Sequence, residues 1–185
     1  MLPVELKEMA DQLDAHCTAI IRKQEDILLR DHSLATGNCE DSFEIIDEIF
    51  LLLDELVNNA GMISKYLHGN NERSTRFRQV LRIDPTTIFS DRSVRNSIEH
   101  FDERLEEIQR DIERFNSQGE GVVKIRKLYI SEPSDSHGRL INCDNLVTSR
   151  KYNPLEGIYS VCNDEINIRA LVHEARILSN KISQD

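Results

Sequence analysis

Three residues near the middle of the chain, Arg95, Asn96 and His100, have side chains of the types that cleavage of RNA without a metal requires. That reaction needs a group to accept the proton of the 2′-hydroxyl, a group to protonate the leaving 5′-oxygen, and a cation beside the phosphate. A histidine titrates near neutral pH, and an arginine binds phosphate with two parallel hydrogen bonds. Asn96 shares the helix face of His100 and can orient the imidazole or the phosphate.

These residues fall in the first turns of a segment, residues 93–115, whose apolar pattern predicts one long helix. Its apolar side chains recur at intervals of three and four, as in a helix that buries one stripe. At about 100° per residue, Arg95 and His100 project roughly 140° apart around such a helix. We therefore expect a homodimer through this helix, with Arg95 of one protomer beside His100 of the other, or both side chains at the rim of one cleft. The stripe consists of Val94, Ile98, Phe101, Leu105, Ile108, Ile112 and Phe115.

The R-N-x-x-x-H spacing of Arg95, Asn96 and His100, with its EHFDERLEE continuation, resembles the signature of the HEPN family of small helical-bundle proteins. The similarity is close from Asp91 to about Glu106 and looser for the helices around it. In that family the motif helices of two protomers face each other and form an RNase site. The resemblance therefore implies a homodimeric endoribonuclease that needs no metal and leaves a 2′,3′-cyclic phosphate, with these three residues as its catalytic group. It also implies a toxin or defence role, often with a nucleotidyltransferase-like antitoxin as partner.

Other interpretations of the same residues involve no catalysis. Some members of the family have lost activity, so the alternative that the resemblance implies is a non-catalytic binding or dimerisation module. His100 can form an ordinary hydrogen bond with Asn96 on a solvated face. Arg95 can form a surface ion pair with Glu99, four residues later, and a neutralised Arg95 would not stabilise a phosphate.

A group of arginines precedes the motif and is the candidate path for RNA. The formal net charge of the chain is −10, and an evenly acidic surface repels a nucleic-acid backbone, so RNA requires a local basic surface and DNA is not expected as a partner. The same arginines are compatible with the solvated face of a short helix. The group consists of Arg73, Arg76, Arg78, Arg82 and Arg92.

The rest of the chain predicts a mainly α fold, a bundle of about four to five helices with a small antiparallel β meander before the last helix. Helical periodicity extends from Pro3 to about Arg30 and from about Ser42 to His68, followed by a short helix over residues 73–82. Residues 122–131, LVTSRKY and GIYSVC predict strands, so the meander covers about residues 122–162. Asp164 is the expected cap of the last helix. We expect residues 1–185 to form a single domain.

Several classes of protein are not expected from this sequence. No apolar run approaches the roughly twenty residues of a membrane span, and the N-terminus has no pattern of a secretory signal, so a cytoplasmic protein without membrane contact is expected. The histidines and cysteines have no metal-binding spacing, and no glycine-rich phosphate loop is present, so we expect neither a metal nor a cofactor. The cysteines are expected to be thiols, and they are Cys17, Cys39, Cys143 and Cys162.

Overall fold

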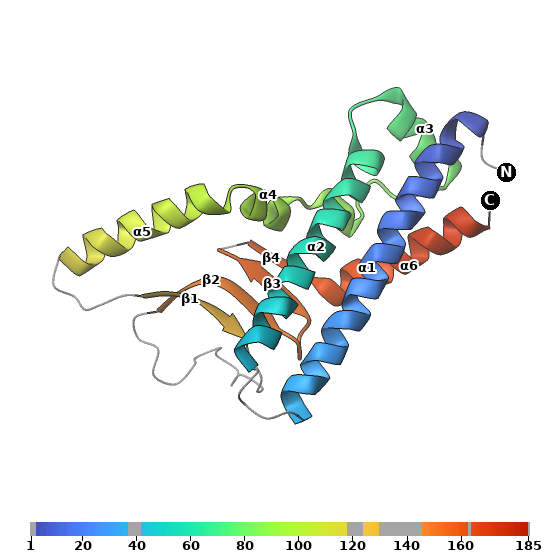
Figure 1. The fold of residues 1–185 in the computed structure, drawn as a ribbon. Helices are drawn as coiled ribbons and strands as arrows, with labels where there is room; N and C mark the ends of the chain where they lie inside the picture. The colour runs from blue at the N-terminus through green and yellow to red at the C-terminus, as the bar shows by residue number, and fades with distance from the viewer. Residues whose placement is uncertain (1–2, 37–41, 118–123, 130–145, 163, 185) are drawn as a thin grey trace. The chain divides into compact units, whose positions relative to one another are not determined.

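The computed structural model describes residues 3–36, 42–117, 124–129, 146–162 and 164–184. The chain is mainly helical with a small sheet before the last helix, as the sequence predicts (Figure 1). It divides into two compact units, the first made of Met1–Arg95 with Ile168–Asp185 and the second of Asn96–Asn167. The sequence predicts a single domain with an inserted meander, and all strands of that meander belong to the second unit.

The first unit is built on two long helices, α1 (Val4–Thr36) and α2 (Ser42–His68), and on the last helix, α6 (Ile168–Ser183). Helix α1 packs against both α2 and α6. A short helix, α3 (Glu72–Val80), and a turn of 3-10 helix, η2 (Ile88–Ser90), pack against α2. These bounds confirm the predicted second helix, and they extend the first helix beyond the predicted end at Arg30.

The core of this unit is formed by the apolar stripes of its three long helices. Each fully buried leucine or isoleucine contributes roughly 1.5–3 kcal/mol relative to an exposed one, so these stripes dominate the stability of the unit. The buried residues are Leu6, Met9, Leu13, Cys17, Ile20 and Ile27 on α1, Ile49, Phe50, Leu53, Leu56, Val57, Ala60, Ile63 and Leu67 on α2, and Ile168, Leu171, Val172, Ala175 and Leu178 on α6.

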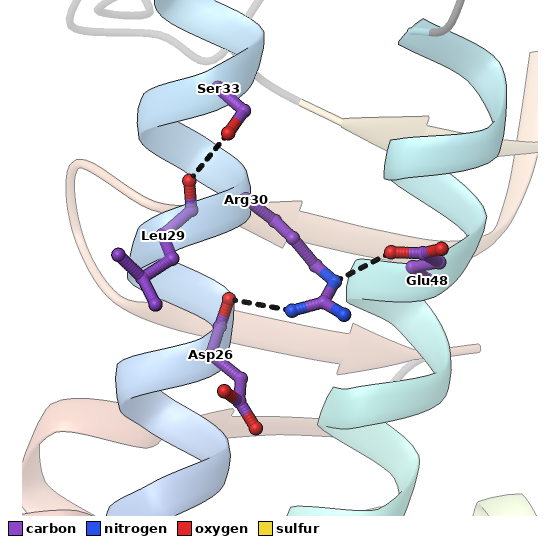
Figure 2. A network of polar contacts seen from close by, with 5 residues as sticks. All are labelled: Asp26, Leu29, Arg30, Ser33 and Glu48. Atoms are coloured by element: carbon purple, nitrogen blue, oxygen red, sulfur yellow. Dashed lines mark hydrogen bonds and ion pairs between the residues drawn. The ribbon is translucent and has the colours of Figure 1, made fainter.

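Polar contacts at the far end of α1 add a weaker link to α2. Figure 2 shows Arg30 reaching across from α1, where its Nε donates to Glu48 Oε2 on α2 at 2.6 Å. The same guanidinium donates to the carbonyl oxygen of Asp26 at 3.3 Å. Both partners of the ion pair are partly exposed, and such pairs contribute at most about 1 kcal/mol. The pair therefore helps to align the two helices and contributes far less than the apolar core.

We expect the thiol of Cys17 to be inert in the native protein. It is fully buried on α1, and burial, followed by the charge of Asp14, raises its pKa to about 12. Since the thiolate is the reactive form, a thiol reagent at about pH 8 should modify Cys17 only after unfolding. Peptide mapping by mass spectrometry after a short exposure measures this, with the half-buried Cys162 as reference. Labelling of Cys17 as fast as Cys162 without denaturant would contradict the prediction.

The second unit contains α5 (Phe101–Ser117) and a four-stranded sheet in the order β1-β2-β3-β4. Strands β2 (Leu146–Asn153), β3 (Ile158–Val161) and β4 (Asp164–Asn167) pair antiparallel, which confirms a meander. Strand β1 (Lys124–Tyr129) instead pairs in parallel with β2. A parallel pair needs a connection of about a dozen or more residues, and residues 130–145 provide that length.

The sequence-based assignment is wrong at Asp164. This residue does not cap the last helix, because it belongs to β4, and α6 begins at Ile168. Val161 pairs with Asp164 across a tight connection in which Cys162 has a φ of 55°. Tight hairpin turns require residues with positive φ, so the backbone reverses here to form a hairpin. An aspartate before an apolar run is compatible with both structures, which is why the sequence does not separate them.

The long helix predicted for residues 93–115 is also wrong as a continuous element. Two helices replace it, α4 (Ser93–Glu99) and α5, with His100 in a turn between them. An apolar period of three and four is preserved across a break of one residue, so periodicity does not report the break. On the predicted stripe, Ile98, Phe101 and Ile112 are only partly buried, and the side chains of the other four residues lie outside the described part.

Within the described residues, none of the helices combines the length and the apolar character that crossing a membrane requires.

Candidate nucleic-acid site at Arg95 and His100

The start of α4 is set by a local cap. Asp91 Oδ1 accepts a hydrogen bond from the backbone N of Ser93 at 2.9 Å and another from Ser93 Oγ at 2.7 Å. These contacts make Asp91 the cap of α4. Because a cap satisfies amide groups that the first helical turn leaves without partners, it fixes where the helix begins. Arg92 and Arg95 therefore leave the backbone at defined points.

Arg95 lies directly across the backbone of α2 at Gly61. A Cβ atom placed on Gly61 would come 1.9 Å from Arg95 Cδ and 2.5 Å from Arg95 Nε. Only glycine leaves room for the arginine there. In the middle of a helix a glycine costs about 1 kcal/mol relative to alanine, so Gly61 lowers the stability of α2 and in return allows Arg95 to occupy this position.

Arg92 makes the neighbouring contact on α2. Its Nε donates to Ser64 Oγ at 2.8 Å, and Ser64 has only 1% of its surface exposed. Ser64 follows Gly61 by three residues and so lies on the same side of the helix. Two arginines are therefore positioned by two small residues of α2. The sequence analysis missed both, because a small residue inside an apolar helix does not by itself indicate which side chain packs against it.

His68 continues the same side of α2 and was not among the predicted site residues. Its Nε2 lies 3.3 Å from Thr87 Oγ1. Burial lowers the pKa of His68, and the positive charges of Arg78 and Arg92 lower it further. We call His68, Arg78 and Arg92 the His68 cluster. Two arginines, from α3 and from the residue before α4, therefore lie close to a histidine of α2.

We expect His68 to titrate below its usual pKa of 6.5, because burial and the two arginines disfavour the imidazolium. The unfolded chain then binds the proton more readily, so the contribution of His68 to stability is present above pH 6.5 and is lost as the pH falls below that value. NMR titration of the imidazole measures the pKa directly. Arg92→Ala should raise this pKa, and Arg76→Ala should leave it unchanged. A value at or above 6.5 in the wild-type protein would contradict the prediction.

His100 lies in the second unit, and its imidazole is largely exposed. The side chain has 60% of its surface exposed, and its Nδ1 lies 3.3 Å from Glu103 Oε2. A carboxylate at Nδ1 favours the tautomer with the proton on that atom, which leaves Nε2 available to accept a proton. Arg150 stacks on the ring of the next residue, Phe101, at 4.6 Å and links the start of α5 to the sheet. Glu103 was missed by the sequence analysis, although a spacing of three on a helix points to it.

Asn96 is exposed. Its backbone carbonyl accepts a hydrogen bond from the backbone amide of His100 at 3.0 Å. The unit boundary falls between Arg95 and Asn96. Arg95 therefore belongs to the first unit, with α2, and His100 belongs to the second unit, with α5 and the sheet. The expected angle of 140° between the Arg95 and His100 side chains holds only for one ideal helix. It no longer applies, because His100 lies in a turn between two helices.

Four of the five arginines predicted to bind RNA separate into two groups. Arg73 donates to the carbonyl of Glu5 at 2.9 Å, and Arg76 pairs with the carboxylate of Glu5 at 2.8 Å. Arg78 instead donates to the carbonyl of Leu67, and Arg92 lies at Ser64. A single basic path along α3 is therefore replaced by one group at α1 and another at His68.

Arg82 has a backbone role at the end of α3. Its φ is 50°, a left-handed conformation that costs a non-glycine residue roughly 1–2 kcal/mol. The amide of the following residue, Ile83, donates to the carbonyl of Arg78 at 2.9 Å and closes the helix end. The carbonyl of Arg82 accepts from Lys181 Nζ on α6 at 3.1 Å. These contacts account for its backbone position, and none of them involves its guanidinium.

Comparisons of the chain with protein-family models, with curated proteins and with solved structures gave no match. In the described part of the chain, no group of three or more His, Cys, Asp and Glu side chains is arranged to hold a metal ion.

Proposed function

We propose that the chain is a metal-independent endoribonuclease of the HEPN type that acts as a homodimer in the cytoplasm. The observation that carries the proposal is the exposed His100 imidazole, whose Nδ1 lies beside the Glu103 carboxylate, within the R-N-x-x-x-H spacing. A histidine held by a carboxylate is a common arrangement of a general base. The close contact of Arg95 with Gly61 adds support, because a helix-destabilising glycine lies where the side chain of the motif arginine crosses α2.

In the proposed reaction the 2′-hydroxyl of the RNA attacks the adjacent phosphorus, and the bond from phosphorus to the 5′-oxygen breaks. His100 accepts the 2′-hydroxyl proton, and a protonated His100, that of the second protomer in a dimer, protonates the leaving oxygen. Arg95 binds the non-bridging oxygens as charge builds on them. Asn96 orients the phosphate. The products are a 2′,3′-cyclic phosphate and a 5′-hydroxyl end.

The test is incubation of the purified full chain with structured and unstructured RNAs in excess EDTA. Cleavage that persists and yields 2′,3′-cyclic phosphate ends, identified by mass spectrometry, is the expected result. Absence of cleavage from every RNA, with protein that is folded and dimeric by light scattering, would reject the nuclease.

The second candidate is a non-catalytic HEPN-like binding or dimerisation module. It is favoured by the contacts of Arg73 and Arg76, because Arg76 pairs with the carboxylate of Glu5 and Arg73 donates to the backbone carbonyl of Glu5, so two of the five arginines expected to meet RNA are engaged within the protein. A nucleotidyltransferase-like antitoxin is the proposed partner for either function. A dimer that forms without cleaving RNA would select this candidate.

A further inference from the structure

A cavity of about 400 Å³ opens beside the His68 cluster. It lies between the end of α2 and the start of α3, and its lining includes His68, Asn71, Thr75 and Arg78. All of these residues belong to the first unit. The volume is ample for a phosphate with part of a nucleotide. The site is therefore a concave surface with a cation in its wall.

Arg78 is held in a fixed orientation at this cavity. Its guanidinium donates to the carbonyl of Leu67 and, at 3.4 Å, to Thr75 Oγ1. A guanidinium carries five N–H donors, so these contacts leave others to meet an anion. An arginine whose side chain is already ordered loses less entropy when it binds a phosphate. Arg78 is thus prepared for binding in a way that a solvated arginine is not.

The surrounding charges favour an anion. His68 lies in the cavity wall, and the charges of Arg78 and Arg92 are close enough to lower its pKa. The first turn of α3 also borders the cavity, and the amide groups of a helix start favour negative charge. One carboxylate in the lining, that of Glu72, opposes this field. In a chain with a net charge of −10, a local convergence of this kind marks where an anion would bind.

We propose that this cavity binds a phosphate of RNA, with Arg78 as its direct ligand, His68 in its wall and Arg92 adding positive charge nearby. The RNA as ligand rests on the proposed function, and the site would hold a substrate phosphate away from the scissile one. Arg78 and Arg92 then carry the RNA contact that the sequence assigned to five arginines. Arg73 and Arg76, which are engaged with Glu5, do not.

The test uses the full chain carrying His100→Ala, so that bound RNA stays intact. Fluorescence anisotropy with a labelled single-stranded RNA measures the affinity over a range of salt concentrations. Arg78→Ala should weaken binding about tenfold and reduce the slope of log affinity against log salt by roughly 0.7, the value for one phosphate contact. Arg76→Ala, a matched change on the same helix, should alter affinity less than about twofold. Equal effects of the two variants, or none, would overturn the proposal.

A second variant is needed because Arg78 also bonds to the carbonyl of Leu67, so Arg78→Ala could weaken binding by disturbing the fold. Glu72→Gln removes the opposing carboxylate and should tighten RNA binding by a few-fold. A disrupted fold would not produce tighter binding, and unchanged or weaker binding would count against the site.

NMR of His68 distinguishes the source of the phosphate. RNA should raise the pKa of His68, whose charged neighbours are Arg78, Arg92 and Glu72. A shift with AMP or inorganic phosphate but none with RNA would overturn the proposal in favour of a small-molecule site. The binding pattern expected here, without cleavage by the wild-type chain, would reject the nuclease and keep this site. Cleavage of RNA that is unaffected by Arg78→Ala would keep the nuclease and reject this site.

Discussion

The His100→Ala variant should cleave RNA about 10²- to 10⁴-fold more slowly than the wild-type protein, because a general acid or base contributes a factor of this size. The imidazole is largely exposed, so its removal should leave the free energy of unfolding nearly unchanged. The rate is measured with a labelled RNA in EDTA under single-turnover conditions. His173→Ala, at another exposed histidine on α6, is the matched control and should keep full activity.

Glu103 extends this prediction to the residue that holds His100. Glu103→Gln keeps the size of the side chain and removes the charge that orients the imidazole at 3.3 Å. We expect a loss in kcat of about tenfold with little change in KM, since a positioning residue acts on the chemical step. Glu113→Gln, at another exposed glutamate of α5, is the control. Wild-type activity in His100→Ala would remove His100 from the mechanism, whatever Glu103 does.

The sequence predicts the fold well where a stripe of side chains is buried. The helical periodicity predicted for α1 and α2 is confirmed by a buried apolar stripe on each helix, because burial of apolar surface selects side chains at a helical period. The same periodicity led to the wrong prediction of a continuous helix through His100. An apolar stripe indicates which side chains share a face, but it does not indicate whether the helical backbone hydrogen bonds continue. The parallel pairing of β1 was also beyond prediction, since strand direction depends on the path of the connection.

The reactive residues of the candidate site remain a prediction from the sequence, and the residues that contact them were missed. Arg95 and His100 were identified because they fall in the R-N-x-x-x-H spacing at the start of a predicted helix. Gly61 and Ser64 were not, because a small residue inside an apolar helix has many explanations until its neighbour is known. Contacts between residues distant in the chain, such as Arg95 with Gly61, are set by helix packing and are not encoded in any local pattern.

Gly61→Ala should displace Arg95 and lower the rate of RNA cleavage by about tenfold or more. The new Cβ would lie 1.9 Å from Arg95 Cδ, and the three nearest atoms all belong to the Arg95 side chain. That side chain is flexible, so it will move before the backbone of α2 does. Arg95→Ala itself should cost about 10²- to 10³-fold, the loss seen when one group that stabilises transition-state charge is removed. Single-turnover cleavage in EDTA measures both variants.

The double variant Gly61→Ala with Arg95→Ala distinguishes two roles of Gly61. Gly61 either leaves room for the Arg95 side chain, or it is needed by the backbone of α2 itself. With Arg95 already replaced by alanine, Gly61→Ala should have no further effect on cleavage. It should then stabilise the protein by about 0.5–1 kcal/mol, because alanine is the better helix former and the obstructing side chain is gone. In the wild-type background the same change should be neutral or destabilising, because Arg95 must leave its place. Urea unfolding of the four proteins tests this without any assumption about activity. Equal changes in both backgrounds would show that Gly61 does not position Arg95.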